Sequence, residues 1–300
     1  MTATPRLSVV VPTRDRPVAL RRCLAALGLQ TAHGLEVVVV DDASRDACAV
    51  ASVVAAIPGA RLVRGAGCGP AAARNAGARA ARAPVVCFTD DDCAPAPAWA
   101  AALNEAVAAG AAAAAGPTRN AAPHRPAAAA AQAITNHLTE AGLDPRTGRL
   151  AFAPTCNLAC RTELLLTLPF DERYPLAAGE DRDWCARLLA AGHTLVHAPA
   201  AVVDHHHELS AAAFWRQQVR YGRGAHRFHR AGGPGLARPG FYAGLLRRGF
   251  AAGPAEGALV CVAQVATAVG MALAASERRG DRPTRSTDAE HRRIAHAERG

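Results

Sequence analysis

The chain has 300 residues, half of them hydrophobic, which is enough for one large domain with appendages and a sizeable core. All 34 basic residues are arginines, which excludes lysine Schiff-base chemistry and a P-loop lysine. The formal net charge of +9 favours anionic partners, and the nine scattered cysteines, without a C-x-x-C pair, argue against a disulfide framework or a zinc site. Together with a short polar start that carries no signal peptide, this cysteine usage predicts a cytoplasmic protein.

Short apolar runs predict buried strands over 7–11, 36–40, 60–64 and 85–89. Helical patterns lie between them, over 17–27, 50–57 and 70–81. Because strands and helices alternate with short links, we expect a mainly parallel sheet flanked by helices. Farther along, the expected elements are a helix within a poorly periodic segment (127–138), a strand (152–158), two helices (161–166 and 179–189) and a strand (193–197).

Polar side chains follow the first, second and fourth of these strands: Thr13 and Arg14, then Asp41 and Asp42, then Asp90, Asp91 and Asp92. Ligands bind outside the carboxyl ends of the strands in an open α/β sheet. Adjacent carboxylates repel one another and are costly to desolvate, so the triplet makes most sense beside a cation, and oxygen ligands suit Mg²⁺ or Mn²⁺. A solvated acidic turn that caps the next helix is the alternative interpretation.

Motifs in this order resemble family-2 glycosyltransferases of the GT-A fold, from residue 7 to about residue 230. They are Val9–Arg16, Val39–Ser44, Ala73–Gly77, Phe88–Asp92 and Gly179–Trp184. The resemblance implies a Rossmann-like, mainly parallel mixed sheet flanked by helices, with a helical C-terminal extension. It also implies metal-dependent transfer, with inversion, of a sugar from a nucleotide-diphosphate sugar to an acceptor hydroxyl.

Carried over residue by residue, the resemblance assigns these roles. The nucleotide would be bound by Pro12, Thr13, Arg14, Asp42, Arg74, Asp90 and Asp91. Mn²⁺ or Mg²⁺ would be held by Asp92, Asp90 and a histidine after a later strand, His205 or His207. Asp181 would be the general base, with Asn157 and Glu180 on the acceptor side.

Each role has a plainer alternative in the same residues. Asp42 could cap the following turn, and Arg74 could pair with a surface carboxylate. Asp181 could be an ordinary acid at a helix start. Asn157 could bond to a turn, and the three consecutive histidines from His205 could form a polar turn, since they lack zinc-ligand spacing.

The last third of the chain is basic and then apolar. Arg216, Arg220, Arg223 and Arg227 recur at helical spacing, which suits either an anionic membrane surface or a face that closes over a diphosphate. The apolar stretch over 258–275 favours a buried or membrane-surface helix over a membrane span. We therefore expect a transferase domain (1–208), a basic, amphipathic helical extension (209–276) and a disordered tail (277–300). If the extension binds a membrane, we expect it to be peripheral on the inner face.

Other functional classes remain open at this point. A nucleotidyltransferase would share the carboxylate–metal site but would show a glycine-rich basic loop after the first strand. A non-catalytic sugar-nucleotide-binding protein would not need Asp181. Nucleic-acid binding would explain the arginines but not the strand-end carboxylates, and no nucleic-acid-binding motif accompanies them. The acceptor, whether a lipid phosphate, a polysaccharide, a peptide or a small metabolite, is not indicated.

Overall fold

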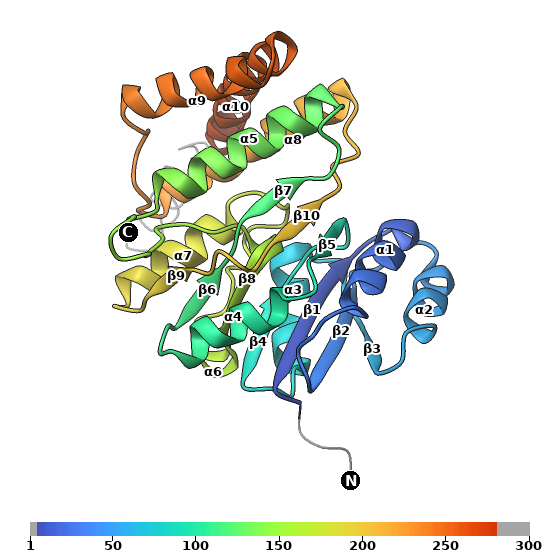
Figure 1. Ribbon diagram of the computed structural model, residues 1–300. Helices are drawn as coiled ribbons and strands as arrows, with labels where there is room; N and C mark the ends of the chain where they lie inside the picture. Colours follow the sequence, from blue (N-terminus) through green and yellow to red (C-terminus); the bar gives the residue numbers. More distant parts are fainter. Residues whose placement is uncertain (1–4, 281–300) are drawn as a thin grey trace, which may run out of the picture.

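A mixed sheet of seven strands, in the order β3-β2-β1-β4-β8-β6-β9, forms the centre of the computed structural model, which describes residues 5–280 (Figure 1). The parallel half consists of β3 (Ala60–Arg64), β2 (Leu35–Asp41), β1 (Leu7–Thr13) and β4 (Val85–Phe88). The other half consists of β8 (Leu158–Arg161), β6 (Ala113–Ala115) and β9 (Leu195–His197). Strand β8 is antiparallel to its neighbours β4 and β6, and β9 is parallel to β6. The predicted fold class, a mainly parallel mixed sheet flanked by helices, is confirmed.

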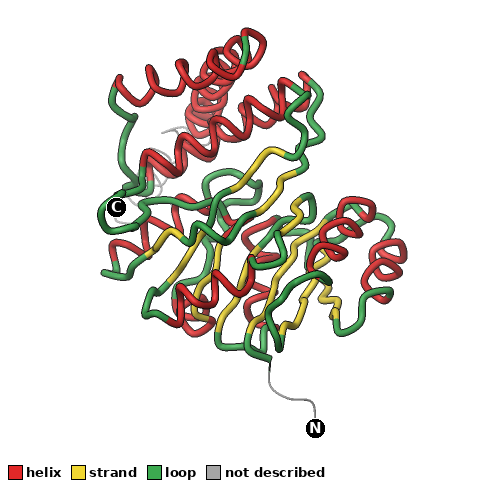
Figure 2. Tube along the Cα trace, viewed as in Figure 1, coloured by secondary structure: helices red, strands yellow, loops and turns green. Residues whose placement is uncertain are grey.

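A smaller sheet of three short strands lies beside the carboxyl end of β4 (Figure 2). It consists of β5 (Cys93–Pro95), β10 (Val203–His205) and β7 (Thr118–Asn120). In the antiparallel pairing of β10 with β5, His205 lies opposite Cys93. This register brings His205 next to the end of the acidic triplet, more than a hundred residues away in sequence.

The predicted strand over 152–158 is wrong. The chain makes a short 3₁₀ turn there, Thr155–Asn157, and the strand begins only at Leu158. Pro154, which lacks a backbone N–H, precedes the turn, and Asn157 binds two backbone carbonyls with its side chain instead of pairing as a strand residue.

Helices cover both faces of the large sheet. On one face lie α1 (Pro17–Leu27), α2 (Ala47–Ala55) and α4 (Trp99–Ala108), packed on a core that includes Val9 and Val11. On the other lie α3 (Pro70–Ala80), α6 (Thr162–Thr167) and α7 (Glu180–Ala190), packed on a core that includes Val10 and Phe88. Neighbouring residues of β1 thus point to opposite faces, as the strand period requires.

A separate group of helices covers the carboxyl-end side of the sheet (Figure 1). It contains α5 (Pro126–Ala141), α8 (Ala211–Arg230), α9 (Pro239–Ala252) and α10 (Pro254–Gly280). These helices share a small core around Phe214, Leu245 and Val260. Helix α5 therefore packs with the extension, although the expected boundary at residue 208 assigned it to the first unit.

Among the described residues, one helical segment, Pro254–Glu277 of α10, is long and apolar enough to cross a membrane, with a mean hydropathy of 2.0. One side of α10 packs on α8, while Val262, Val265, Val269 and Leu273 are exposed on another. The helix is assigned to Gly280, past residue 277, where we expected the disordered tail to begin. The rest of the predicted disordered tail, 281–300, lies outside the described residues.

Candidate active site

A cleft of about 850 Å³ opens where the neighbouring strands β2, β1 and β4 end, and we call it the strand-end cleft. The residues to which sequence analysis gave nucleotide-binding or metal-binding roles line it together: Pro12, Thr13, Arg14, Asp42, Arg74, Asp90, Asp91, Asp92 and His205. Parallel strands deliver their carboxyl ends to one edge, which is why residues from distant parts of the chain meet here.

Asp92 is the carboxylate of the triplet that contacts His205. Its Oδ1 atom lies 3.2 Å from Nε2 of His205, and its Oδ2 atom accepts a hydrogen bond of 3.0 Å from Arg16. Burial opposes the charge on both groups, but their mutual contact holds the pKa of Asp92 well below its usual value and raises that of His205 to about 9. The pair is therefore ionised at neutral pH.

Asp91 points inward. Thr13 Oγ1 donates a hydrogen bond of 2.7 Å to its carboxylate, and Arg16 donates a longer one of 3.2 Å. Burial, and then the charge of Asp92, raise the pKa of Asp91 to about 7. The negative charge of the triplet is thus only partly offset by the arginine and the histidine beside it.

This donor set fits a divalent cation. Asp90 and Asp92 offer carboxylate oxygens at the cleft, and His205 would offer an imidazole nitrogen once a cation displaced the proton that it shares with Asp92. Carboxylates suit Mg²⁺ and Mn²⁺, and a cation would relieve the repulsion that raises the pKa of Asp91. A second group of ligand atoms, from Cys93, Cys156 and His205, also gathers within 4.8 Å, but burial raises the pKa of the Cys93 thiol well above its usual value. Thiolates suit softer ions than Mg²⁺ or Mn²⁺, so this second group does not fit the same cation.

Arg74 connects the acidic triplet with the Glu-Asp motif of α7. Its guanidinium donates to Asp90 Oδ1 and to Glu180 Oε1, each at 2.9 Å, and its side chain is only 4% exposed. Burial would lower its pKa, but the two carboxylates raise it, so the arginine keeps its charge. Arg74 thus pairs with the buried carboxylate of Glu180 and the partly exposed carboxylate of Asp90, and it lines the cleft where a phosphate could approach it.

Asp42 holds the glycine-rich turn after β3. Its two carboxylate oxygens accept hydrogen bonds of 2.9 Å from the backbone N–H groups of Gly67 and Gly69. Gly69 has a φ of 96°, and a Cβ there would lie 2.2 Å from the carbonyl oxygen of Pro175, so the turn requires glycine. Asp42 therefore caps this distant turn, not the turn that follows it in sequence as its alternative supposed, and it also lines the cleft.

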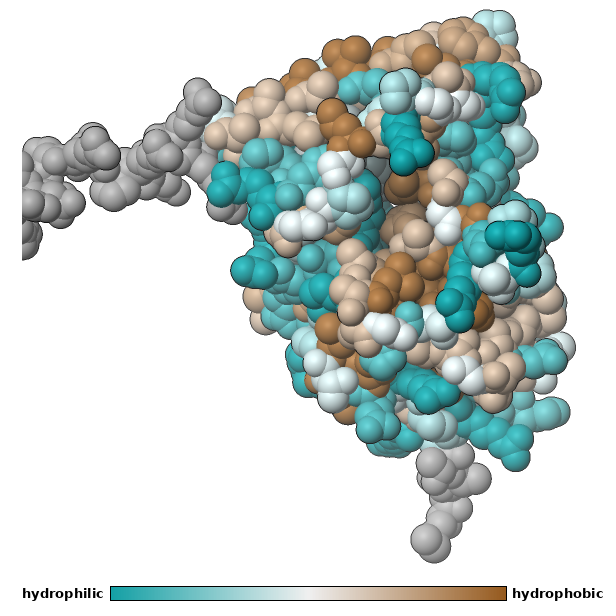
Figure 3. Space-filling model, turned by 90° about the vertical axis from the view of Figure 1, so that its left-hand side faces the viewer, coloured by the Kyte–Doolittle hydropathy of each residue, from teal (hydrophilic) through white to brown (hydrophobic). Residues whose placement is uncertain are grey.

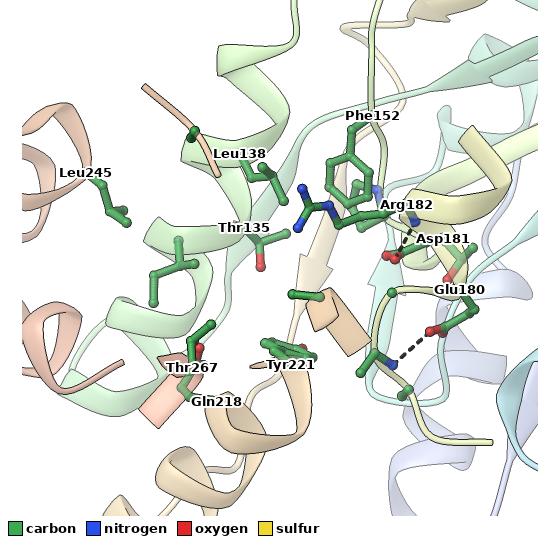
Figure 4. Close-up of a pocket in the computed structure, with 18 of the residues that line it drawn as sticks. Thr135, Leu138, Phe152, Glu180, Asp181, Arg182, Gln218, Tyr221, Leu245 and Thr267 are labelled. Carbon is green, nitrogen blue, oxygen red and sulfur yellow. Dashed lines mark hydrogen bonds between the residues drawn. The ribbon is translucent and has the colours of Figure 1, made fainter. Parts of the chain in front are cut away.

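Asp181 lies in the first turn of α7 and faces a second cavity of about 290 Å³, which we call the interhelical pocket (Figure 4). Its carboxylate accepts a hydrogen bond of 2.8 Å from the backbone N–H of Arg182. Burial, and then the neighbouring charge of Glu180, raise the pKa of Asp181 to about 7. A carboxyl with such a pKa exchanges its proton near neutral pH.

The two acceptor-side predictions fit the structure poorly. Asn157 is fully buried, accepts from the indole N–H of Trp99 and donates to the carbonyls of Pro117 and Ala201, so it cannot face an acceptor. Glu180 borders the interhelical pocket, but its carboxylate is engaged by Arg74 and by the backbone N–H of Ala178. Both side chains thus organise the scaffold of the site.

Sequence reasoning assigned no individual role to several side chains of the cleft. Arg16 binds two carboxylates of the triplet, and Arg216 and Arg220 of α8 line the cleft from the opposite side. The sequence shows the helical spacing of the α8 arginines, but not which part of the molecule they face. Arg223 pairs with Glu277 at 2.8 Å and Arg227 lies over the ring of Tyr174, so only part of the basic face borders the cleft.

Comparisons with known proteins give the same picture. Residues 8–167 match the sequence model of glycosyl transferase family 2, and residues 90–275 match that of glycosyl transferase family group 2. Two curated proteins named pre-mycofactocin glycosyltransferase, from Mycobacterium tuberculosis strains CDC 1551 / Oshkosh and ATCC 25618 / H37Rv, are each 31% identical over 228 residues. The matches cover 73% of this chain and 46% of each relative, so the chain spans about half the length of the curated relatives it matches.

A solved structure shares the fold over nearly the whole chain. The mannosyltransferase PcManGT from Pyrobaculum calidifontis, in complex with GDP-Man and Mn²⁺, matches with a TM-score of 0.57 and 23% identity. The match covers 98% of this chain and 81% of that one. At this level of identity the likeness concerns the fold alone.

Proposed function

The chain belongs to glycosyl transferase family 2, and we propose that this glycosyltransferase moves a sugar from a nucleotide-diphosphate sugar to an acceptor hydroxyl in a metal-dependent, inverting reaction. The observation that supports this proposal is that the strand-end cleft and the interhelical pocket meet. Arg74, Asp90, His205 and Tyr221 line both. A donor in the cleft would direct its sugar toward the pocket that contains Asp181.

Asp181 would act as the general base. Its carboxylate takes the proton of the acceptor hydroxyl as the hydroxyl oxygen bonds to the anomeric carbon and the bond from that carbon to the diphosphate breaks. A base is most effective when its pKa lies near the working pH, and the pKa of Asp181 is raised to about 7. A single displacement inverts the anomeric centre, so no covalent nucleophile is required.

The diphosphate would be stabilised from several sides of the cleft. Asp92, Asp90 and His205 would hold the Mn²⁺ or Mg²⁺ ion, which supplies Lewis-acid neutralisation of the leaving diphosphate when bound. Arg216 and Arg220 line the opposite wall, where guanidinium groups can pair with phosphate oxygens. This arrangement places positive charge where negative charge develops during the reaction.

The test is nucleotide release from UDP-, GDP- and dTDP-sugars with Mn²⁺, compared between the wild-type chain and Asp181→Asn. Because PcManGT was solved with GDP-Man and Mn²⁺, GDP-mannose is the first donor to try. We expect slow hydrolysis of one donor, loss of release on adding EDTA, and an inactive variant that still binds nucleotide. Failure of every nucleotide to bind in the presence of metal would overturn the proposal.

We also propose that the protein is cytoplasmic and binds anionic membrane surfaces through the exposed apolar side of α10. The net charge of +9 and the exposed side chains of Val262, Val265, Val269 and Leu273 support this. We expect the protein to co-sediment with phosphatidylglycerol-containing vesicles more than with phosphatidylcholine vesicles. Val265→Asp should reduce this binding, and equal sedimentation of the variant and the wild type would exclude the surface.

A further inference from the structure

The walls of the interhelical pocket are mainly apolar. They include Leu138 on α5, Tyr221 on α8, Leu245 on α9, Met271 on α10, and Phe152 on a loop. Figure 3 shows a hollow with hydrophobic walls between the helical group and the sheet. A sugar or an oligosaccharide needs many hydrogen-bonding groups, and these walls supply only scattered ones, among them Thr135, Gln218 and Thr267.

Charged groups gather at the end of the pocket beside α7. Asp181 and Arg182 both lie there, and Figure 4 shows the Arg182 guanidinium extending between Phe152 and Thr135. The Arg182 guanidinium stacks over the ring of Phe228, 4.9 Å from its centroid. Within the part of the chain that the structure describes, it makes no ion pair with a carboxylate. Burial lowers its pKa, and the charge of the neighbouring Asp181 offsets this effect only in part.

A half-buried cation without a counter-ion is costly, and a bound anion removes that cost. The side chain of Arg182 directs its charge into the same cavity that Asp181 faces. An acceptor that placed its hydroxyl at Asp181 would therefore bring its neighbouring groups within reach of Arg182. An anionic group at that position would gain a charge-assisted hydrogen bond in an apolar surrounding.

The size of the cavity limits the acceptor further. Its volume of about 290 Å³ lies at the lower end of the range of ~300–1,000 Å³ that is usual for small-molecule pockets. A compact ring system fits this space, whereas a growing polysaccharide does not. Of the acceptors that sequence analysis left open, the cavity thus favours a small metabolite.

We propose that the interhelical pocket binds a small acceptor with a compact apolar body and an anionic group, and that Arg182 pairs with that group while the acceptor hydroxyl reacts at Asp181. This inference rests on the proposed glycosyl transfer for the identity of the ligand as acceptor. The recognition itself, an apolar body with an anion, rests only on the pocket. The two parts can therefore be tested separately.

The first experiment measures binding of two fluorescent probes that differ in one group. Anilinonaphthalene sulfonate carries an apolar ring system and an anion, and phenylnaphthylamine carries the same rings without the anion. Arg182→Gln should weaken the sulfonate probe about 10-fold, which corresponds to ~1.4 kcal/mol, and leave the neutral probe within about 2-fold. Equal weakening of both probes, or of neither, would overturn the role of Arg182.

A second variant tests the pocket itself. Ala225 of α8 lines the pocket, whereas Ala212 of the same helix is exposed and lines neither cavity. Ala225→Trp should fill the space and weaken both probes, and Ala212→Trp should weaken neither. If the probes bind equally well to Ala225→Trp, they bind elsewhere and the pocket assignment is wrong. Unchanged binding of GDP with Mn²⁺ to both variants would show that they are folded.

The transfer assay then separates this inference from the proposed function. Hydroxyphenylacetate and its amide are compared as acceptors, with free mannose as a third. We expect a lower KM for the carboxylate than for the amide, a difference that Arg182→Gln should remove. Equal KM values, or preference for mannose, would reject the acceptor class while leaving glycosyl transfer intact. Probe binding without nucleotide binding would reject glycosyl transfer while leaving the pocket intact.

Discussion

Arg74 lies between the carboxylates of Asp90 and Glu180: its Nη2 atom is 2.9 Å from Asp90 Oδ1, and its Nη1 atom is 2.9 Å from Glu180 Oε1. Asp90 begins the acidic triplet that follows β4, and Glu180 begins the helix that carries Asp181. A single buried arginine thus fixes the distance between the strand-end cleft and the interhelical pocket. The relative position of the proposed metal site and the proposed base depends on this contact.

Removal of this arginine should be costly. Arg74→Gln leaves two carboxylates without their partner, and breaking a buried ion pair in this way typically costs about 3–5 kcal/mol of unfolding free energy. The matched control is Arg248→Gln, which breaks the ion pair with Glu140 at the surface. An exposed pair contributes about 0–1 kcal/mol. Urea unfolding of the two variants measures the difference, and similar losses in both would contradict the role given to Arg74.

Substitution of the base should abolish activity with little effect on nucleotide binding. Asp181→Asn removes a general base, and we expect kcat to fall by about 10²–10⁴. Asp183, in the same helical turn, pairs with Arg187 at 2.7 Å and lines neither cavity, so Asp183→Asn is the control. A control variant as inactive as Asp181→Asn would indicate damage to the helix and not loss of the base.

The pH dependence follows from the raised pKa of Asp181, about 7 in the folded protein. The base works only as the carboxylate, so activity should fall as the pH drops below about 7. The folded protein also holds this proton more tightly than the unfolded chain does. The contribution of Asp181 to stability therefore decreases as the pH rises from the ordinary pKa of a carboxyl group to above 7. Asp181→Asn should therefore have a higher Tm than the wild type at pH values above 7. A lower Tm there would contradict a buried charged carboxylate.

Gly224 of α8 is the point where the helical group contacts the loop before α7. A Cβ at this residue would lie 2.2 Å from the carbonyl oxygen of Ala178, which is backbone and cannot move alone. Gly224→Ala should therefore lower both the Tm and the activity, because the same loop holds Glu180 and Asp181. Gly240 of α9 has open space around it, so Gly240→Ala is the control and should leave both unchanged. Normal activity of Gly224→Ala would show that the contact is not needed.

Most strands of the parallel half could be predicted because each is a short apolar run that ends in polar residues. The strand from Ala60 to Arg64 has the predicted ends, and the acidic triplet follows β4 as expected. The strand end also fixes where the carboxylates lie, since parallel strands share an edge. These parts depend on local sequence and on one topological rule.

The rest depends on contacts between distant elements. The spacing of the α8 arginines shows that they share a side of the helix, but only packing against α10 decides that Arg216 and Arg220 border the cleft. Similarly, nothing near Asn157 in sequence indicates that Trp99, Pro117 and Ala201 would surround it. The orientation of Arg182 into the pocket could not be predicted from the sequence either, because it depends on where α5 and α8 lie in the fold.

The most direct test of the account is calorimetric titration of the protein with GDP, UDP and dTDP, each with Mn²⁺ and with EDTA. We predict that one nucleotide binds at least about 10-fold more tightly with Mn²⁺, and that Asp92→Asn removes this difference. That result would place nucleotide and metal together at the strand-end carboxylates. Binding of no nucleotide, or binding that neither Mn²⁺ nor Asp92→Asn alters, would contradict the account.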